Sequence, residues 1–311
     1  MNDWKPSPVP ELHPPPQTPL PEPPSTIRRI FVGPGGIRAG WRLALYLIMA
    51  AVVAVALGFV LQGWHPQGAA RLWRELAAEF SLFLAAVIPA VVMGRIEKRS
   101  PADYGLPAQD AFGKLFWVGT IWGILAITVL LGAMRGVHVF SFGHLTLHGI
   151  RILKFAFFWG LFFLLVGFFE EFLLRGYTQF TLASAIGFWP AATALSLVFG
   201  FIHLGNPGEA WVGAISAGLI GFFFCLTLRR TGHLWFAVGF HFSFDWGETF
   251  LYSVPNSGTT APGHLLSSSF QGPRWLTGGT VGPEGSVFVF ALIALLWVAF
   301  NRMYPEVRYP V

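Results

Sequence analysis

The chain has 311 residues, of which 54% are hydrophobic and only 11% are charged. Ordinary globular proteins carry roughly a quarter charged residues, so this composition excludes a soluble domain and indicates a membrane protein. The formal net charge of +5 does not point to a nucleic-acid partner, because polytopic membrane proteins concentrate Lys and Arg in their cytoplasmic loops. The single cysteine, Cys225, excludes an intrachain disulfide and a multi-cysteine metal site.

The chain begins with a segment that is very rich in proline, residues 1–26. So many prolines allow neither a helix nor a packed core. We therefore expect this segment to be an extended, disordered tail.

Eight apolar segments follow the tail. A helix of about 20 residues crosses the roughly 30 Å core of a bilayer, and most of these segments are long enough, although the fifth and the eighth are short. We therefore expect an all-α fold, a polytopic membrane helix bundle of about eight transmembrane helices. The segments are residues 41–62, 76–94, 115–133, 152–174, 189–204, 210–228, 234–252 and 286–300.

The distribution of positive charge predicts the orientation of the bundle. With the N-terminus inside, thirteen Lys and Arg residues fall in inner segments and six in outer ones, which favours both termini in the cytoplasm and a multi-pass protein of the inner membrane. The inner residues are Lys5, Arg28, Arg29, Arg38, Arg42, Arg95, Lys98, Arg99, Lys114, Arg229, Arg230, Arg302 and Arg308; the outer ones are Arg71, Arg74, Arg135, Arg151, Lys154 and Arg274.

The sequence "GFFEEFLLRGY" places three ionisable residues, Glu170, Glu171 and Arg175, at the end of the fourth apolar segment. Ionisable groups inside spanning helices are costly and usually mark a functional site. Residues four apart share a face of a helix, so Glu171 and Arg175 can pair, while Glu170 points about 100° away. One glutamate is therefore neutralised and the other is free.

A second polar group lies on the fifth segment, where Phe199 precedes His203 by one turn. A lone histidine on an apolar helix is more often a packing residue than a catalyst. However, the turn before this helix is centred near Gly187, which Glu170 precedes by 17 residues and His203 follows by 16. Both groups then lie about 25 Å from the turn if both arms are helical, so they can meet.

The third group is "HFSFDWGE" on the seventh segment, where His241, Asp245 and Glu248 share one helical face. Asp245 and Glu248 lie near a helix end and could instead be interfacial residues at the headgroups. His241 lies only about nine residues past a basic turn, so we expect it to be shallower than His203 unless the helices tilt or the hairpin that carries Glu170 and His203 protrudes into the cytoplasm. The sixth segment carries Gly213, Ala217 and Gly221 at four-residue intervals, which permits close helix packing.

A free carboxylate and two histidines in a low-dielectric cavity can activate a water molecule for attack on a carbonyl, while other donors hold the oxyanion. Glu170, His203 and His241 would also suit zinc with water as the fourth ligand. The "HExxH" signature of many zinc proteases is absent from the sequence. The sequence therefore leaves the cofactor open between none and zinc.

The three groups together resemble the motifs of the CPBP intramembrane proteases, a family that includes the type II CAAX prenyl proteases and bacterial abortive-infection-type proteins. The motifs are Glu170-Glu171-x-x-x-Arg175, Phe199-x-x-x-His203 and His241-x-x-x-Asp245, and the resemblance covers about residues 150–252.

The resemblance implies a role for each residue. Glu170 would be the general base and His203 its partner on the water, while His241 and Asp245 would hold the oxyanion or orient the substrate. Glu171, Arg175 and Phe199 would support the site, with Glu248 as a further candidate. The family often has Asn at the Asp245 position.

The hypothesis is therefore an intramembrane endopeptidase that hydrolyses a peptide bond at or within the bilayer, with a membrane protein or peptide as substrate. The family's CAAX specificity is not carried over. The alternatives are a catalytically silent immunity or scaffold protein of the same fold and a transporter, whose inverted repeats we do not find. The predicted parts are the tail (1–26), the N-terminal transmembrane helices (27–149), the catalytic transmembrane core (150–252), an exposed loop (253–285) and the last transmembrane helix with its tail (286–311).

Overall fold

A computed structural model describes residues 30–33, 36–68 and 70–309. The proline-rich tail predicted for residues 1–26 lies outside the described residues. The chain divides into a small N-terminal unit, which ends at Arg38, and a large unit from Ala39 onward. In the small unit, β1 (Val32–Gly33) pairs antiparallel with β2 (Gly36–Ile37).

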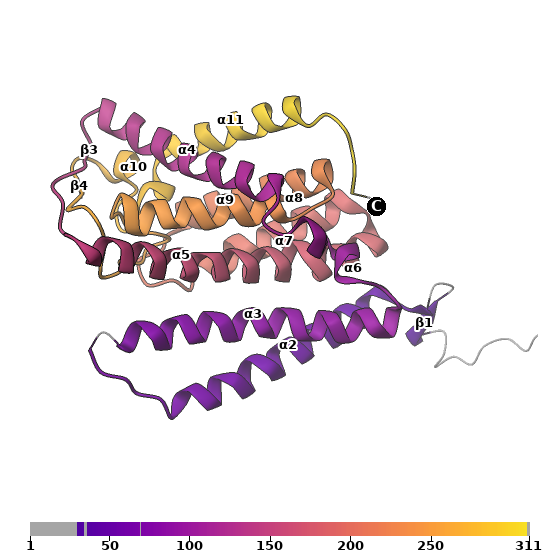
Figure 1. Ribbon diagram of the computed structural model, residues 1–311. Coiled ribbons are helices and arrows are strands. Elements are labelled where there is room, and N and C mark those ends of the chain that lie inside the picture. The colour runs from indigo at the N-terminus through magenta and orange to yellow at the C-terminus, as the bar shows by residue number, and fades with distance from the viewer. Residues whose placement is uncertain (1–29, 34–35, 69, 310–311) are drawn as a thin grey trace, which may run out of the picture. The chain divides into compact units, whose positions relative to one another are not determined.

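The large unit is an all-α bundle, which confirms the predicted fold class (Figure 1). Each of the eight apolar segments contains a helix, because apolar side chains surround these stretches and the backbone must satisfy its own hydrogen bonds in lipid. The helices are α2 (Ala39–Gln62), α3 (Ala70–Glu97), α4 (Lys114–Gly136), α5 (Ile150–Glu171), α6 (Thr178–Ile186), α7 (Phe188–His203), α8 (Trp211–Thr231), α9 (Trp235–Trp246), α10 (Arg274–Thr277) and α11 (Val287–Met303).

In the part of the chain that the structure describes, five helical stretches are long and apolar enough to cross a membrane: α2, α3, α4, α8 and the run Ile150–Ile186, which contains α5 and α6. The helices α7 and α11 are apolar but shorter, and α9 has 12 residues. Large apolar side chains project outward from the bundle; Val60 on α2 and Phe157 on α5, for example, are 74% and 71% exposed. Such surfaces are expected where a helix faces lipid.

The fourth predicted segment, residues 152–174, is longer than expected and is interrupted. Between α5 and α6 the chain forms a π-helical segment, η3 (Phe172–Tyr177), and Gly176 there has non-helical angles of φ −83° and ψ −113°. Such π-helical insertions are rare and occur frequently at functional sites. This one begins directly after Glu171 and contains Arg175.

Helices α4 and α9 approach so closely that their backbones touch. A Cβ atom added at Gly119 or Gly123 of α4, or at Gly239 of α9, would overlap backbone atoms of the other helix. The hydroxyl of Ser243 on α9 also donates a 2.8 Å hydrogen bond to the carbonyl of Thr120 on α4. This packing, which small residues permit in membranes, fixes the position of the helix that carries His241 and Asp245.

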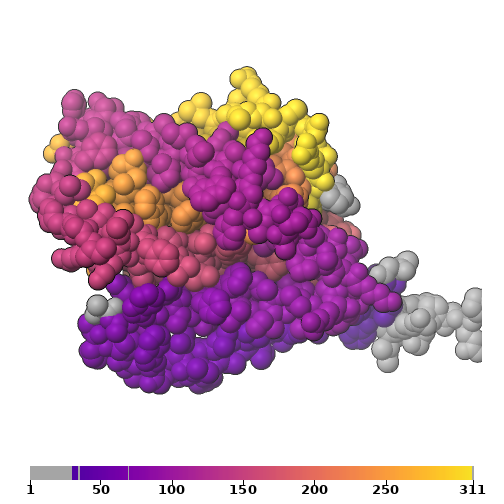
Figure 2. All heavy atoms as spheres, in the orientation of Figure 1, coloured from indigo at the N-terminus to yellow at the C-terminus, as the bar shows by residue number. Residues whose placement is uncertain are grey.

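Helix α3 lies beside α5, and α2 packs against α3 and α6 (Figure 1). Side chains fill the space that the ribbons leave between α3 and α5 (Figure 2). At the Glu97 end of α3, the Glu97 carboxylate pairs with Arg42 of α2 at 2.9 Å and accepts a hydrogen bond from the Tyr177 hydroxyl. The ends of α2, α3 and η3 are thereby tied together.

The segment between α9 and α11 has structure of its own. It contains β4 (Ser269–Phe270), which pairs antiparallel with β3 (Phe140–Ser141), and its residues Val254 and Val281 are buried. Close backbone contact holds it in place, because Gly258 lies against Gly208 and has no room for a Cβ. The loop predicted from its glycine and serine content is thus packed onto the bundle.

The close contact between α4 and α9 predicts that Gly123→Val destabilises the protein. The valine side chain must displace the backbone of Phe240 and the hydroxyl of Ser243, and overpacking of this kind costs about 1–3 kcal/mol or more. Thermal unfolding in detergent should show a lower melting temperature than for the unmodified protein. Gly132→Val is the matched control on the same helix, since a Cβ there meets nothing within 4 Å; equal melting temperatures for both variants would contradict this packing.

Candidate active site

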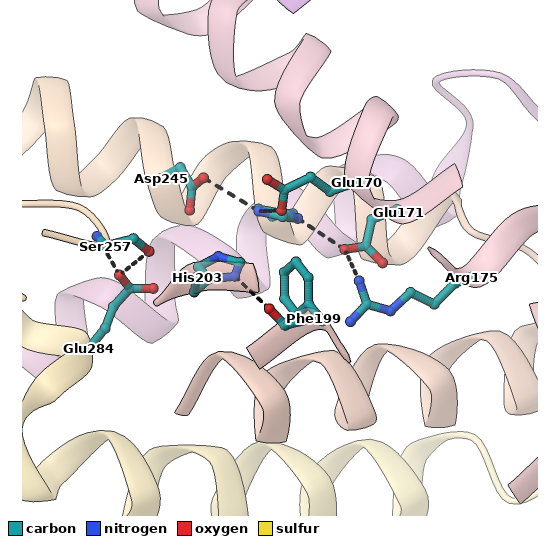
Figure 3. Close-up of polar contacts among 9 residues, drawn as sticks. Glu170, Glu171, Arg175, Phe199, His203, Asp245, Ser257 and Glu284 are labelled. Atoms are coloured by element: carbon teal, nitrogen blue, oxygen red, sulfur yellow. Dashed lines mark hydrogen bonds and ion pairs between the residues drawn. The ribbon is translucent and has the colours of Figure 1, made fainter. Parts of the chain in front are cut away.

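Residues of the three predicted motifs lie close together (Figure 3). Those of the first and third motifs surround one imidazole ring, that of His241 on α9. Its Nε2 lies 3.6 Å from Oε2 of Glu170 and 3.5 Å from Oδ2 of Asp245. Its Nδ1–H donates a 3.0 Å hydrogen bond to Oε1 of Glu171. The ring therefore lies among three carboxylates, two of which come from the end of α5 and one from its own helix.

The Glu171 carboxylate pairs with Arg175, as the four-residue spacing predicts. Nη1 of Arg175 lies 3.2 Å from Oε1 of Glu171, and both side chains are 0% exposed. Glu170 points in another direction, and its side chain is 25% exposed. One glutamate is thus neutralised in the protein interior while the other faces a cavity.

Glu171 has a second partner that the sequence did not reveal. The oxygen that binds Arg175 also accepts the hydrogen bond from His241, which lies 70 residues away in the chain. The pairing of His241 with Asp245 that the sequence suggests is therefore only part of the arrangement, because Nδ1 and Nε2 of the ring face different carboxylates. Glu171 fixes the orientation of the ring, and Asp245 lies on the side that faces the cavity.

The Arg175 guanidinium is packed between two helices. It lies over the ring of Phe199 on α7, with its Cζ atom 4.3 Å from the ring centroid, and cation–π contacts of this kind are stabilising away from water. On its other side is Gly221 of α8, where an added Cβ would overlap Nη2 of Arg175. The glycine and alanine stripe of the sixth predicted segment thus has a role in the site as well as in helix packing.

His203 is the last residue of α7, and its Nδ1–H donates a 2.9 Å hydrogen bond to the carbonyl of Phe199. A carbonyl oxygen can only accept, so in the neutral ring Nε2 is left as an acceptor. His203 lines the same cavity as Glu170 and His241. We expected His241 to lie at a shallower depth in the membrane than His203, yet both histidines line this one cavity.

The cavity has a volume of about 790 Å³, within the usual range for ligand pockets. Aromatic and aliphatic side chains form most of its wall, among them Trp159 and Phe163 of α5 and Leu292 of α11. Glu170, His203, His241, Asp245 and the unpredicted residue Glu284 add polar groups.

Glu284 follows α10 in a one-turn 3₁₀ helix, η5 (Pro283–Gly285), and sequence patterns gave no sign of its position. Its Oε2 accepts hydrogen bonds from the backbone N–H of Ser257 at 2.8 Å and from the Ser257 hydroxyl at 2.9 Å. Ser257 has a φ of 41°, which is unusual for a residue with a side chain. Burial and the nearby Asp245 carboxylate raise the pKa of Glu284 to about 7, although the Ser257 hydrogen bonds act in the opposite direction.

The other candidate on α9, Glu248, does not reach the cavity. It lies in a second π-helical segment, η4 (Gly247–Leu251), and its side chain is fully buried. Within the described part of the chain, neither of its carboxylate oxygens has a hydrogen-bond partner. The structure thus separates Glu248 from Asp245, although both were expected on one face.

A zinc site would require Glu170, His203 and His241 to converge on one point. Among residues 30–33, 36–68 and 70–309, no group of three or more His, Cys, Asp or Glu side chains is arranged to hold a metal ion. Nε2 of His241 faces two carboxylates instead. The described geometry therefore does not fit a three-ligand zinc site.

Comparison with protein families gives a match to the family model "Type II CAAX prenyl endopeptidase Rce1-like" over residues 152–247. The matched region begins in α5 and ends at the first residue of η4, so it contains all three motifs. It confirms the resemblance that the motifs indicate. Comparisons with curated proteins and with solved structures gave no match. Glu284 and Ser257 lie outside the matched region.

The contact between Gly221 and Arg175 predicts that Gly221→Ala damages the site. The methyl group takes the space of Nη2 and displaces the guanidinium from Glu171. Loss of a buried ion pair costs about 3–5 kcal/mol. This value is the upper limit for the loss of stability, because the Arg175 side chain can shift and keep part of the interaction. We expect a lower melting temperature in detergent and reduced activity. Gly160→Ala on α5 is the control, since its Cβ would lie 3.8 Å from Trp246 in ordinary contact. A Gly221→Ala variant as stable as this control would argue against the assigned packing.

Proposed function

Since residues 152–247 form an Rce1-like domain in a multi-pass membrane protein, we propose that this chain is an intramembrane endopeptidase. Its substrate is a membrane protein or peptide, cleaved at or within the lipid bilayer. The observation that carries the proposal is the carboxylate of Glu170, which has no arginine or lysine partner among the described residues and faces a largely apolar cavity beside two histidines, while its neighbour Glu171 is neutralised by Arg175.

The first step is activation of a water molecule. Glu170 takes a proton from the water, and Nε2 of His203 accepts a hydrogen bond from the other O–H group. This role fits His203 because its Nδ1–H is already engaged by Phe199. The low dielectric of the cavity strengthens both interactions, and a positioned base of this kind contributes about 10²- to 10⁴-fold to the rate.

The water oxygen then bonds to the carbonyl carbon of the scissile peptide, and the carbonyl oxygen becomes an oxyanion. In the proposed mechanism, His241 donates a hydrogen bond to the oxyanion, while Asp245, whose ionised carboxylate can only accept hydrogen bonds, orients His241 or the peptide. Both residues line the cavity, and Oδ2 of Asp245 lies 3.5 Å from Nε2 of His241. Collapse of the intermediate breaks the C–N bond, and Glu170 returns its proton to the leaving amine. The step consumes one water and needs no other reactant.

The ion pair and the π-helical segment have a positioning role in this mechanism. Glu170 and Glu171 are adjacent in the chain. The pairing of Arg175 with Glu171 therefore also fixes the direction in which the Glu170 side chain leaves the helix. Preorganised groups of this kind act without reorganisation during the reaction. We further propose that the protein lies in the inner membrane with both termini in the cytoplasm, as the charge distribution favours.

Glu170→Gln should abolish hydrolysis and leave the fold intact, because it removes only the proton acceptor. Cleavage of a library of membrane-embedded peptides by purified protein measures the first effect, and thermal unfolding in detergent measures the second. Glu75→Gln is the matched control: Glu75 lines the same cavity but pairs with Arg71 at 3.6 Å near the surface. Normal cleavage by the Glu170→Gln variant would rule out the mechanism.

Asp245 distinguishes an orienting role from a proton-accepting or metal-binding one. We expect Asp245→Asn to remain largely active, because an amide can still accept a hydrogen bond and can donate one to an oxyanion. Asp245→Leu should be inactive, because it removes every hydrogen bond. Rates for both variants on one peptide substrate make the comparison. A folded but inactive Asn variant would disprove the orienting role and favour a metal ligand, since an amide is a weak ligand.

A further inference from the structure

The cavity occupies one end of the bundle. On α3 its lining residues belong to the first third of the helix and end at Glu79, and on α11 they end at Leu296. On α7 they are the last residues, Phe199 and His203. Since neighbouring helices run in opposite directions, these positions all lie toward the same end. Glu170 and Phe240 are the lining residues furthest from that end on α5 and α9.

The connections at this end form the mouth of the cavity. They comprise the α2–α3, α4–α5, α7–α8 and α9–α11 segments, and they interlock: Thr280 donates a 2.8 Å hydrogen bond to the carbonyl of Gly208, and Thr146 N–H donates a 2.9 Å bond to that of Leu265. Gly68, Arg71, Thr259 and Thr260 are exposed and also line the cavity, so they form its rim.

The opposite end of the bundle is closed by packing. The N–H of Leu234 donates a 2.7 Å hydrogen bond to the carbonyl of Gly105, and that of Arg308 donates a 3.0 Å bond to the carbonyl of Arg229. Buried aromatic and aliphatic side chains fill the space between, among them Tyr104 and Trp235. The described C-terminal residues lie at this end, away from β3, β4 and α10 (Figure 1).

The charges indicate which end faces the cytoplasm. In the described part of the large unit, nine Lys and Arg residues lie at the closed end and six at the open end, with Arg175 in the site. The positive-inside rule therefore places the closed end in the cytoplasm. The nine are Arg42, Arg95, Lys98, Arg99, Lys114, Arg229, Arg230, Arg302 and Arg308; the six are Arg71, Arg74, Arg135, Arg151, Lys154 and Arg274.

From this arrangement we propose that the site receives its substrate from the extracytoplasmic face. The substrate class is then a membrane-spanning peptide cleaved in the extracytoplasmic end of its apolar segment, and a cytoplasmic C-terminal tetrapeptide is excluded. This proposal rests on the proposed protease function. The apolar wall formed by residues such as Trp159 and Leu292 accommodates the buried part of that segment, and the polar rim faces its solvated part.

Thiol labelling in membrane vesicles of known orientation tests the proposal. Cys225 is fully buried and is the only cysteine in the sequence, so the unmodified protein provides the unlabelled background. In right-side-out vesicles, a membrane-impermeant maleimide should label Thr260→Cys at the rim. In inside-out vesicles it should label Ser100→Cys at the closed end. The reverse pattern would overturn the proposal.

A third variant tests whether the cavity itself opens to that face. Ile220 of α8 lines the cavity and has no place in the proposed chemistry. The Ile220→Cys variant should react with a small cationic methanethiosulfonate in right-side-out vesicles and be protected in inside-out ones. Reaction from the inside, or from neither face while the denatured protein reacts, would contradict an open extracytoplasmic cavity.

Thiol labelling does not require catalysis, so its result is independent of whether the protein is a protease. Cleavage is measured on single-span peptides reconstituted in one orientation, with the same randomised residues at either end of the span. Peptide products cut at the end of the span that lies on the same membrane face as Thr260 support the proposal. Products cut at the opposite end of the span refute it. If the labelling pattern holds but no peptide is cut, the protease function fails and the assigned face of the cavity stands.

Discussion

The geometry of the site depends on one buried carboxylate oxygen, Oε1 of Glu171. It lies 3.2 Å from Nη1 of Arg175 and accepts a 3.0 Å hydrogen bond from His241. A charged group in a low-dielectric interior is stable only when it is paired, and loss of a partner strands the remaining charge. Through this atom, the end of α5 is joined to α9, and the contact of Arg175 with Phe199 extends the connection to α7.

Charged groups can meet in the interior only because the helices approach closely. Gly119 and Gly123 of α4 have no side chains, so α9 can approach until the two backbones touch. Gly221 of α8 likewise leaves room for the guanidinium of Arg175. In lipid there is little hydrophobic gain in pressing helices together, so close backbone contact supplies much of the association through van der Waals packing. The same small residues therefore stabilise the bundle and define the site.

The two ends of the bundle serve different purposes. One end is filled with buried side chains and joined by hydrogen bonds between connections, and it includes the pair of Arg42 with Glu97. The other end is hollow, and its connections pack against one another although they contain many glycines. Contact between the backbones of Gly208 and Gly258 holds them, and Ser257 adopts a strained φ that places two donors on Glu284. Strain of this kind persists where the surroundings over-determine the backbone.

Composition alone determined that this is a membrane protein, because apolar segments of spanning length admit few other structures in lipid. The spacing of residues on a helix also determined the pairing of Glu171 with Arg175, since helical periodicity fixes local neighbours. Only the tertiary structure brought His241 to Glu171 and Glu284 into the cavity. Those contacts join residues distant in the chain, and they depend on how each helix is rotated, tilted and interrupted, as at Gly176. Periodicity carries no information about these quantities, because packing against other helices decides them.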